Sequence, residues 1–317
     1  IDDYYFLRYN PTKVLNNPDL KPQITSDYEI GFRQLITRSS SLSLTASYRE
    51  QRNMIQLVRY YQAYPVSYIS YGNIDLSTIK GFRTEYQLNR LHFRMNASYT
   101  FQIAEGTGSG TGSQGSLISA GQPNLRNLFP LSFDIRHNIK FFFFHNFGSE
   151  KTYEGPVYKG RQLLANTGIG LTLNAFSGAP YTANALATPN AQSGIAARSP
   201  IKGTPNGSRL PWSLENNIRI SRSFPVVMGK RDGKIIPGEF SLTLWVENFL
   251  NIQNIQSVHP YTGSASTDGY LSSPSGQGAV ESATNAQSFI DLYNARLANP
   301  GFYNLPRRTR LSLLLTF

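Results

Sequence analysis

Charged side chains occupy alternate positions in several segments, where they could bind a polar solute or pair with one another. Around Arg94 and around Arg219, polar and apolar residues take turns along the chain. Positions two apart in a strand point to the same side of a sheet, so each segment would gather its charges on one face. We expect that face to line a polar passage, with a static ion-pair network as the stronger alternative for any single residue. The candidates are Glu85, Arg94, Asp134, Arg136, Lys140, Glu215 and Arg219.

Tyrosine residues gather in the connections between these segments and could bind a ligand. Rigid aromatic rings bind sugars, peptides and chelates at low entropic cost. At the level of lipid headgroups, tyrosines instead form an interfacial girdle. We favour the girdle for tyrosines at strand ends and leave both interpretations open for those at loop tips. The loop candidates for a ligand or a partner are Tyr60, Tyr61, Tyr64, Tyr68, Tyr261 and Tyr270.

No catalytic residue, metal site or cofactor is predicted. Cysteine is absent, and the four histidines show no ligand spacing with one another or with carboxylates. Gly110, Gly112 and Gly115 match a G-x-G-x-x-G motif, but they lie in a Ser/Thr/Gly tract that we expect to be mobile. The formal charge of +11 is assigned to the polar faces of strands rather than to nucleic acid, because no nucleic-acid-binding module is visible.

Alternation of apolar and polar residues predicts nine β-strands. In the clearest segment, residues 91–103, every odd position is apolar and every even position is polar. This period of two gives each strand one apolar and one polar face. His137 falls on the apolar face, which predicts either a place near an interface or a slip in register. The predicted strands cover residues 27–36, 42–51, 79–88, 91–103, 133–144, 163–176, 212–224, 240–250 and 307–317.

These strands suit a lipid bilayer better than a soluble core. The mean hydropathy is −0.32, and the chain has no run of about 18 apolar residues that could form a transmembrane helix. Nearly every strand repeats the same alternation over the roughly 9 to 13 residues that a tilted strand needs to cross a membrane. We therefore expect an all-β fold, a transmembrane antiparallel β-barrel whose apolar faces contact lipid.

Connections of different length alternate along the chain. The tight hairpins are 37–40 and 89–90, and the long loops are 104–132, 177–211 and 251–306. Outer-membrane barrels have short periplasmic turns and long extracellular loops, which predicts a periplasmic C-terminus. The medium connections 148–162 and 225–238 are expected to extend their hairpins beyond the membrane. Apolar spacing over 283–298 predicts a short helix in the last loop.

The chain is expected to be part of a larger barrel. Residues 1–25 should form an extracellular loop segment that leads into the first strand, and residues 26–317 the C-terminal part of the barrel. Nine is an odd number, whereas single-chain bacterial outer-membrane barrels have even numbers of strands, and an open edge in lipid leaves backbone groups unpaired. The start at Ile1 lacks a signal peptide, which favours an internal cut.

Several segments resemble those of one known family. In chain order they are NPDLKP (17–22), DYEIGF (27–32), GFRTE (81–85), SGAPYT (177–182), NGSRLP (206–211), VENFLN (246–251) and PRRTR (306–310), which leads to Phe317. Each is weak alone, but together and in this order they are similar to the C-terminal half of a TonB-dependent outer-membrane receptor. The resemblance is to the Bacteroidetes type, in the SusC and carboxypeptidase-regulatory-like class.

The resemblance implies the last nine strands of a 22-stranded barrel closed around an N-terminal plug, with the plug and earlier strands absent here. It implies coupling to TonB through the missing N-terminal part, and Phe317 as a signal for the barrel-assembly machinery. The location implied is the bacterial outer membrane, among lipid and lipopolysaccharide, and a Sus-type system would add a surface lipoprotein partner. The charged candidates would then face the lumen or the plug.

Two functions of different classes are expected from these observations. The leading hypothesis is an active-transport receptor, not an enzyme, that imports a large or scarce solute such as an iron chelate, a glycan or a peptide. The alternative is a receptor-like barrel that serves as a structural or assembly subunit of a larger outer-membrane complex. The loop sequences do not indicate which of these solute classes is imported.

Overall fold

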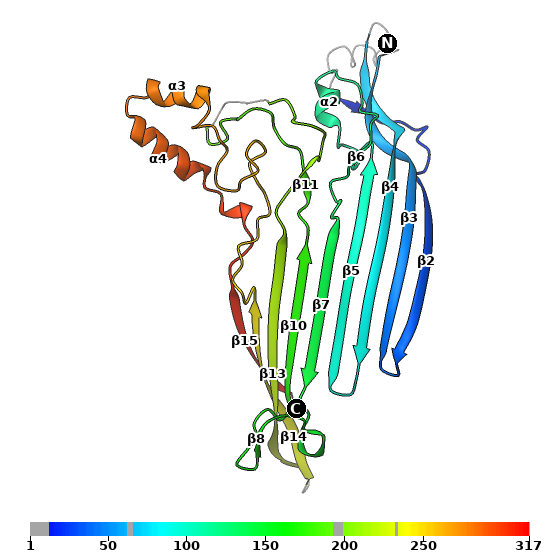
Figure 1. The fold of residues 1–317 in the computed structure, drawn as a ribbon, viewed down its shortest axis with the longest axis vertical. Coiled ribbons are helices and arrows are strands. Elements are labelled where there is room, and N and C mark those ends of the chain that lie inside the picture. Colours follow the sequence, from blue (N-terminus) through cyan, green and yellow to red (C-terminus); the bar gives the residue numbers. More distant parts are fainter. Residues whose placement is uncertain (1–12, 62–65, 193–198, 232–233, 317) are drawn as a thin grey trace.

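The computed structural model describes residues 13–61, 66–192, 199–231 and 234–316. Within those residues, nine long strands form one antiparallel sheet in which each strand pairs with its neighbours in the sequence (Figure 1). They are β2 (Ile24–Thr37), β3 (Ser40–Tyr60), β4 (Tyr68–Asn89), β5 (Phe93–Gly106), β7 (His137–Asn146), β10 (Thr167–Phe176), β13 (Ser213–Arg231), β14 (Lys234–Glu247) and β15 (Arg308–Thr316). All nine predicted strands are confirmed, and β2 and β15 form the two edges of the sheet.

Shorter elements lie at the ends of the sheet. β1 (Val14–Leu15) pairs parallel with β4, and β6 (Phe129–Pro130) pairs with β5. Two small hairpins stand apart from the main sheet, β8 (Val157–Tyr158) with β9 (Arg161–Gln162), and β11 (Pro180–Tyr181) with β12 (Ser208–Arg209). The helical elements are α2 (Gly115–Ser119), η1 (Glu150–Thr152), α3 (Pro274–Ser282), α4 (Ala286–Leu297) and η2 (Pro300–Phe302). None of the described helices is long and apolar enough to cross a membrane.

The sheet has two ends of different character (Figure 1). One end carries the turns of the β2–β3 and β4–β5 hairpins and is called the hairpin end below. The other end carries the long connections, with α3 and α4 packed above the strands, and is called the loop end. The short helix predicted in the last loop is confirmed as α4, whereas α3, directly before it, was not predicted.

Apolar side chains cover one face of the sheet and remain exposed. Ile30 is 76% exposed, Ile139 45% and Leu313 64%, although each lies in a regular strand. A soluble sheet would bury such a face under a second layer, because a contiguous apolar surface in water is unfavourable. The buried apolar residues instead lie mainly in the loop-end connections, for example Leu131, Ile118 and Tyr293. The face therefore has the composition of a lipid-facing surface.

The β3–β4 hairpin is longer than predicted. The predicted strands end at Gln51 and begin at Ile79, but the structure continues them to Tyr60 and from Tyr68. The pairing shifts near Met54, next to Asn53, whose φ of 56° is in the left-handed region. This bulge changes the parity of the hairpin, so the alternation that identifies a strand is interrupted at that point.

Two medium connections behave differently from each other. Residues 225–238 do extend a hairpin, because β13 and β14 continue their pairing to Arg231 and Lys234. Residues 148–162 do not, because they fold into η1 and the separate β8–β9 hairpin, so this part of the prediction is wrong. Glu150 and Gln162 hold that unit together through two hydrogen bonds of 3.0 and 2.9 Å.

The Gly-rich tract, residues 106–115, is anchored to β3 and β4 through its buried residues 106–108 and 114, whereas residues 110–113 are exposed and their mobility stays a prediction. The Gln56 side chain is fully buried and donates to the carbonyl of Gly110 and to the Ser113 hydroxyl, at 3.0 and 2.9 Å. A Cβ at Gly108 would lie 2.0 Å from an oxygen of Asp75. Glycine is required there because the backbone approaches the carboxylate too closely for any side chain.

Candidate functional site

The polar face of the sheet brings five of the seven charged candidates together. Strand register places Glu85 opposite Ser98, Ser98 opposite Lys140, and Lys140 opposite Asn174. Asn174 in turn lies opposite Glu215, so one straight row crosses five strands. A second row carries Arg94 and Arg219 on either side of Phe144 and Gly170. Their shared face is what the period of two predicted, and their contact with a passing solute stays a prediction.

Only part of this polar face is neutralised by ion pairs. Glu85 accepts hydrogen bonds from Arg83, Gln87 and Asn96 at 2.7 to 2.8 Å, so it belongs to a fixed network. Glu215 accepts one from Asn174 at 3.1 Å. Arg94, Lys140 and Arg219 are exposed and form no ion pair with any described residue.

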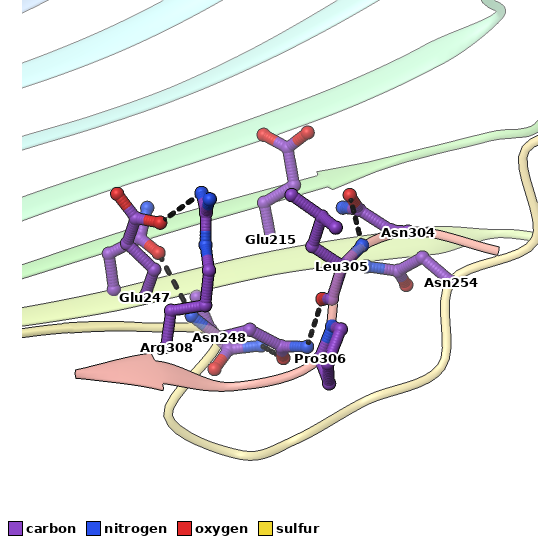
Figure 2. Close-up of a pocket in the computed structure, with 10 residues that line it drawn as sticks. Glu215, Glu247, Asn248, Asn254, Asn304, Leu305, Pro306 and Arg308 are labelled. Atoms are coloured by element: carbon purple, nitrogen blue, oxygen red, sulfur yellow. Dashed lines mark hydrogen bonds and ion pairs between the residues drawn. The ribbon is translucent and has the colours of Figure 1, made fainter. Parts of the chain in front are cut away.

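A pocket of about 200 Å³ lies where β13, β14 and β15 meet the last loop (Figure 2). Glu247 and Arg308 form an ion pair at 2.5 Å on one side, and the Glu215 carboxylate projects separately on the other (Figure 2). The remaining lining is rich in amides and includes Asn217, Asn248, Asn254 and Asn304. Carboxylates and amides in such an arrangement offer hydrogen bonds to a polar ligand.

The floor of this pocket is built by asparagines that bond to the backbone. Asn248 and Asn251 have φ values of 51° and 54°, a region that asparagine tolerates better than most residues. The Asn248 side chain accepts from Ile252 N–H at 2.9 Å and donates to the carbonyls of Ile252 and Leu305. Fully buried Asn216 accepts from Leu250 N–H at 2.8 Å. Asn251 likewise accepts from Arg307 N–H at 3.0 Å, so both asparagines hold backbone groups in place at the end of β14.

Asp134 and Arg136 lie elsewhere, because β7 begins only at His137. Asp134 is fully buried in the turn before the strand, so its predicted place on the polar face of a strand is wrong. Its carboxylate accepts from Ala104 N–H at 2.8 Å and pairs with Arg209, while Arg136 Nε lies 3.5 Å away. Arg209 was not among the candidates, and the only signal for it was the NGSRLP segment. The pair fastens the β11–β12 hairpin to the sheet.

His137 lies at the start of β7, among aromatic rings at the loop end. Its ring stacks between Tyr99 and Trp212, with centroids at 6.1 and 5.7 Å, and the Tyr99 hydroxyl lies 2.9 Å from Nδ1. The β5–β7 pairing is regular up to Phe101 and His137, so there is no slip in register, and the place of His137 near a membrane interface stays a prediction. These rings are the amphipathic type that suits a membrane interface.

The five tyrosine candidates that the structure describes do not form one site. Tyr60 and Tyr68 stack at 5.2 Å across the β3–β4 hairpin, and the Tyr61 hydroxyl donates to the carbonyl of Gly121 at 2.9 Å. Tyr261 is 45% exposed in the last loop. Tyr270 is only 7% exposed, so it packs inside the loops and offers no ligand surface. Tyr64 and the terminal Phe317 lie outside the described residues.

Around Tyr270, the loops form a compact unit with a polar centre. The Tyr270 ring stacks on Tyr293 of α4 at 5.5 Å, and the Tyr293 hydroxyl donates to buried Asp268 at 2.5 Å. Burial, followed by the hydrogen bond to Asp268, raises the pKa of Tyr293. Asp268 also accepts from Asn190 N–H at 3.2 Å, which joins the loop after β10 to the loop after β14.

His259 is the titratable neighbour of this unit. Its Nδ1 lies 3.2 Å from the Asn190 amide nitrogen, while its Nε2 is buried without a partner among the described residues. Burial lowers the pKa of His259, with a smaller opposing effect from Asp268. Nowhere in the described ranges do three histidine or acidic side chains gather closely enough to bind a metal ion.

The sequence comparison decides the family. Residues 2–218 match the family described as TonB dependent receptor-like, beta-barrel, which is more than half of the chain. The chain belongs to this family. Among the solved structures similar to this chain is the outer membrane transporter YddB from Escherichia coli, with 14% identity and a TM-score of 0.48. A second similar structure is the FrpB iron transporter from Neisseria meningitidis, with 10% identity and a TM-score of 0.43.

This chain corresponds to only part of each of those two longer proteins. The match with the Escherichia coli protein covers 77% of this chain and 31% of the other. The match with the Neisseria protein covers 76% of this chain and 29% of the other. The chain thus spans less than a third of the solved structures that it resembles, and no curated protein matches it.

Proposed function

We propose that the chain is the C-terminal part of an outer-membrane receptor that imports a large or scarce solute with energy supplied through TonB. The observation that carries the proposal is the family match, combined with a sheet that is apolar on one face and charged on the other. The charged row from Glu85 to Glu215 would then line the lumen, and the apolar face would contact lipid. The solute class stays open between an iron chelate, a glycan and a peptide.

The proposal includes an orientation. The short turns of the hairpin end would lie in the periplasm, with the C-terminus, and the loop end would lie outside the cell. In support, the buried carboxylates of Asp268 and Asp134 lie at the loop end, where their hydrogen bonds fix the conformation of the long connections. A fixed extracellular surface favours capture, because fewer conformations are lost on binding.

The partners are part of the same proposal. TonB would act through segments that precede this chain, the barrel-assembly machinery would read the C-terminal strand with Phe317, and lipid and lipopolysaccharide would surround the apolar face. A receptor of the Bacteroidetes, SusC-like class would add a surface lipoprotein. The resemblance of the segments NGSRLP and VENFLN supports that class, and the same segments supply Arg209 and Asn248 to the anchors described above.

Whole-cell uptake with the full-length receptor tests this function. Cells that express it would be compared with and without TonB, for a panel of iron chelates, oligosaccharides and peptides. We expect uptake of at least one class that stops when TonB is removed. Uptake that continues unchanged without TonB would refute active transport. No uptake of any class, with the receptor recovered in a stable complex of outer-membrane proteins, would favour the structural subunit instead.

A further inference from the structure

Charge is distributed unevenly across the polar face of the sheet. On β2 to β4, the face carries three cations, Arg33, Arg49 and Arg83, and three carboxylates, Asp27, Glu29 and Glu85. Asp27 pairs with Arg49 at 2.5 Å and Glu85 with Arg83 at 2.8 Å, so the charges on these strands balance. From β5 to β15, the same face carries five cations and three carboxylates. The cations are Arg94, Lys140, Arg219, Arg308 and Arg310, and the carboxylates are Glu215, Glu239 and Glu247. Among the described residues, Arg308 with Glu247 is the only ion pair in this half.

Three of the unpaired cations share one line of the register, called the basic row below. Arg94 lies opposite Phe144, and Gly170 separates Phe144 from Arg219. Trp245 separates Arg219 from Arg310. With neighbouring strands about 4.8 Å apart, the backbones at Arg219 and Arg310 are about 10 Å apart, and those at Arg94 and Arg219 about 14 Å. The guanidinium groups are thus close enough for one multiply charged molecule to reach two of them.

A hollow lies beside Arg310 at one end of the basic row. It has a volume of about 190 Å³ and is lined by Trp245, Glu247, Arg308, Thr309 and Arg310. The Arg310 guanidinium lies 6.0 Å from the centroid of the Trp245 ring, which holds it over an apolar floor. On the other side of Arg219, Gly168 and Gly170 carry no side chain, and the Phe144 ring would lie 3.1 Å from a Cβ at Gly168.

We propose that the basic row is a binding site for acidic groups, carboxylate or phosphate, on the solute that enters the barrel. This inference rests on the proposed function and narrows its solute class to anionic molecules. Guanidinium groups bind carboxylates and phosphates through paired, charge-assisted hydrogen bonds. Because cations and carboxylates are equal in number on β2 to β4, whereas cations are in excess from β5 to β15, an acidic solute would be drawn to the β13–β15 side of the lumen.

Binding of small anions to the full-length receptor in detergent tests the site. Isothermal titration calorimetry would use citrate as the carboxylate probe, tripolyphosphate as the phosphate probe and maltohexaose as the neutral probe. We expect at least one anion to bind, and the Arg219→Gln/Arg310→Gln double variant to bind it at least tenfold more weakly. Arg38→Gln, which removes an exposed charge from the β2–β3 turn, should change the affinity less than twofold. The affinity for citrate, compared with that for tripolyphosphate, identifies whether the site prefers carboxylate or phosphate.

Two further variants distinguish a specific anion site from a general effect of charge. Arg310→Lys keeps the charge but loses the paired geometry, so it should bind the anion with an affinity between those of the wild type and the double variant. Trp245→Phe should remove the part of the fluorescence change that anion binding causes near the row. Anion binding that is unchanged in the double variant would overturn the proposal, as would a folded wild type that binds neither anion. If TonB-dependent uptake persists in that case, only the basic row fails; if uptake is independent of TonB, the proposed function fails.

Discussion

Replacing Asp134 by alanine should destabilise the receptor more than any single change on the polar face. The side chain is fully buried, and its loss removes two interactions at once. Ala104 N–H, which is also fully buried, would lose its acceptor at 2.8 Å. Arg209, which bonds both the carboxylate and the main-chain oxygen of Asp134, would keep only the latter, at 2.5 Å.

The magnitude follows from these two losses. Breaking a buried ion pair by removing one partner costs about 3 to 5 kcal/mol. The Arg209 side chain is 25% exposed and can reach water, so we expect about 3 kcal/mol for Asp134→Ala. Asp134→Asn keeps an oxygen that can accept from Ala104. The difference between the two variants should therefore report that hydrogen bond, about 1 to 3 kcal/mol for a buried donor left unpaired.

Urea unfolding of the full-length receptor in detergent, followed by tryptophan fluorescence, would measure both values. Arg52→Gln is the matched control, because it breaks a pair whose arginine is 67% exposed and should leave the free energy of unfolding nearly unchanged. Limited proteolysis should show the β11–β12 hairpin cut faster in Asp134→Ala, because its anchor to the sheet is gone. An Asp134→Ala variant as stable as the Arg52→Gln control would refute the reasoning.

Three further predictions concern the loop end. Asn248→Ala should lower the free energy of unfolding by about 2 to 4 kcal/mol, because it removes several backbone hydrogen bonds and strains a left-handed φ; urea unfolding would check this, with Asn248→Gly separating the two effects. Because burial lowers the pKa of His259 below 6.5, only the unfolded state takes up a proton as the pH falls through that value, so stability present above it is lost below it. Protection against hydrogen exchange at residues 259–270, corrected for the intrinsic exchange rate at each pH, should therefore fall between pH 7.5 and 5, and a His259→Gln variant should lack that dependence. Tyr293→Phe should cost about 1.5 to 3 kcal/mol through the lost bond to Asp268, seen as faster proteolysis near α4, and wild-type protection in that variant would contradict the assignment.

The loop end also shows how close contacts decide which residues remain available to a ligand. Tyr261 and Tyr270 lie in the same loop and are of the same type, yet their exposed fractions are 45% and 7%. The difference arises because α4 brings Tyr293 onto the Tyr270 ring. A tyrosine in a long loop is therefore a ligand candidate only after the packing of that loop is known.

The sequence alone determined the sheet and its two faces. A period of two is a local property, since side chains alternate along any strand regardless of what surrounds it. The shared face of Arg94, Lys140 and Arg219 therefore followed from parity. The family segments also predicted that the sheet belongs to a TonB-dependent receptor barrel, and the family match over residues 2–218 supports this prediction.

The tertiary structure alone decided the buried polar contacts. Asp134 meets Arg209 across 75 positions of sequence, and Asp268 meets Asn190 across 78, so no local pattern could pair them. The Gly-rich tract has a mobile composition, but the β3–β4 hairpin supplies Gln56 and Asp75 to hold it. The physical reason is the same throughout: strand parity is fixed by neighbouring residues, whereas burial is fixed by whichever distant segment arrives to exclude water.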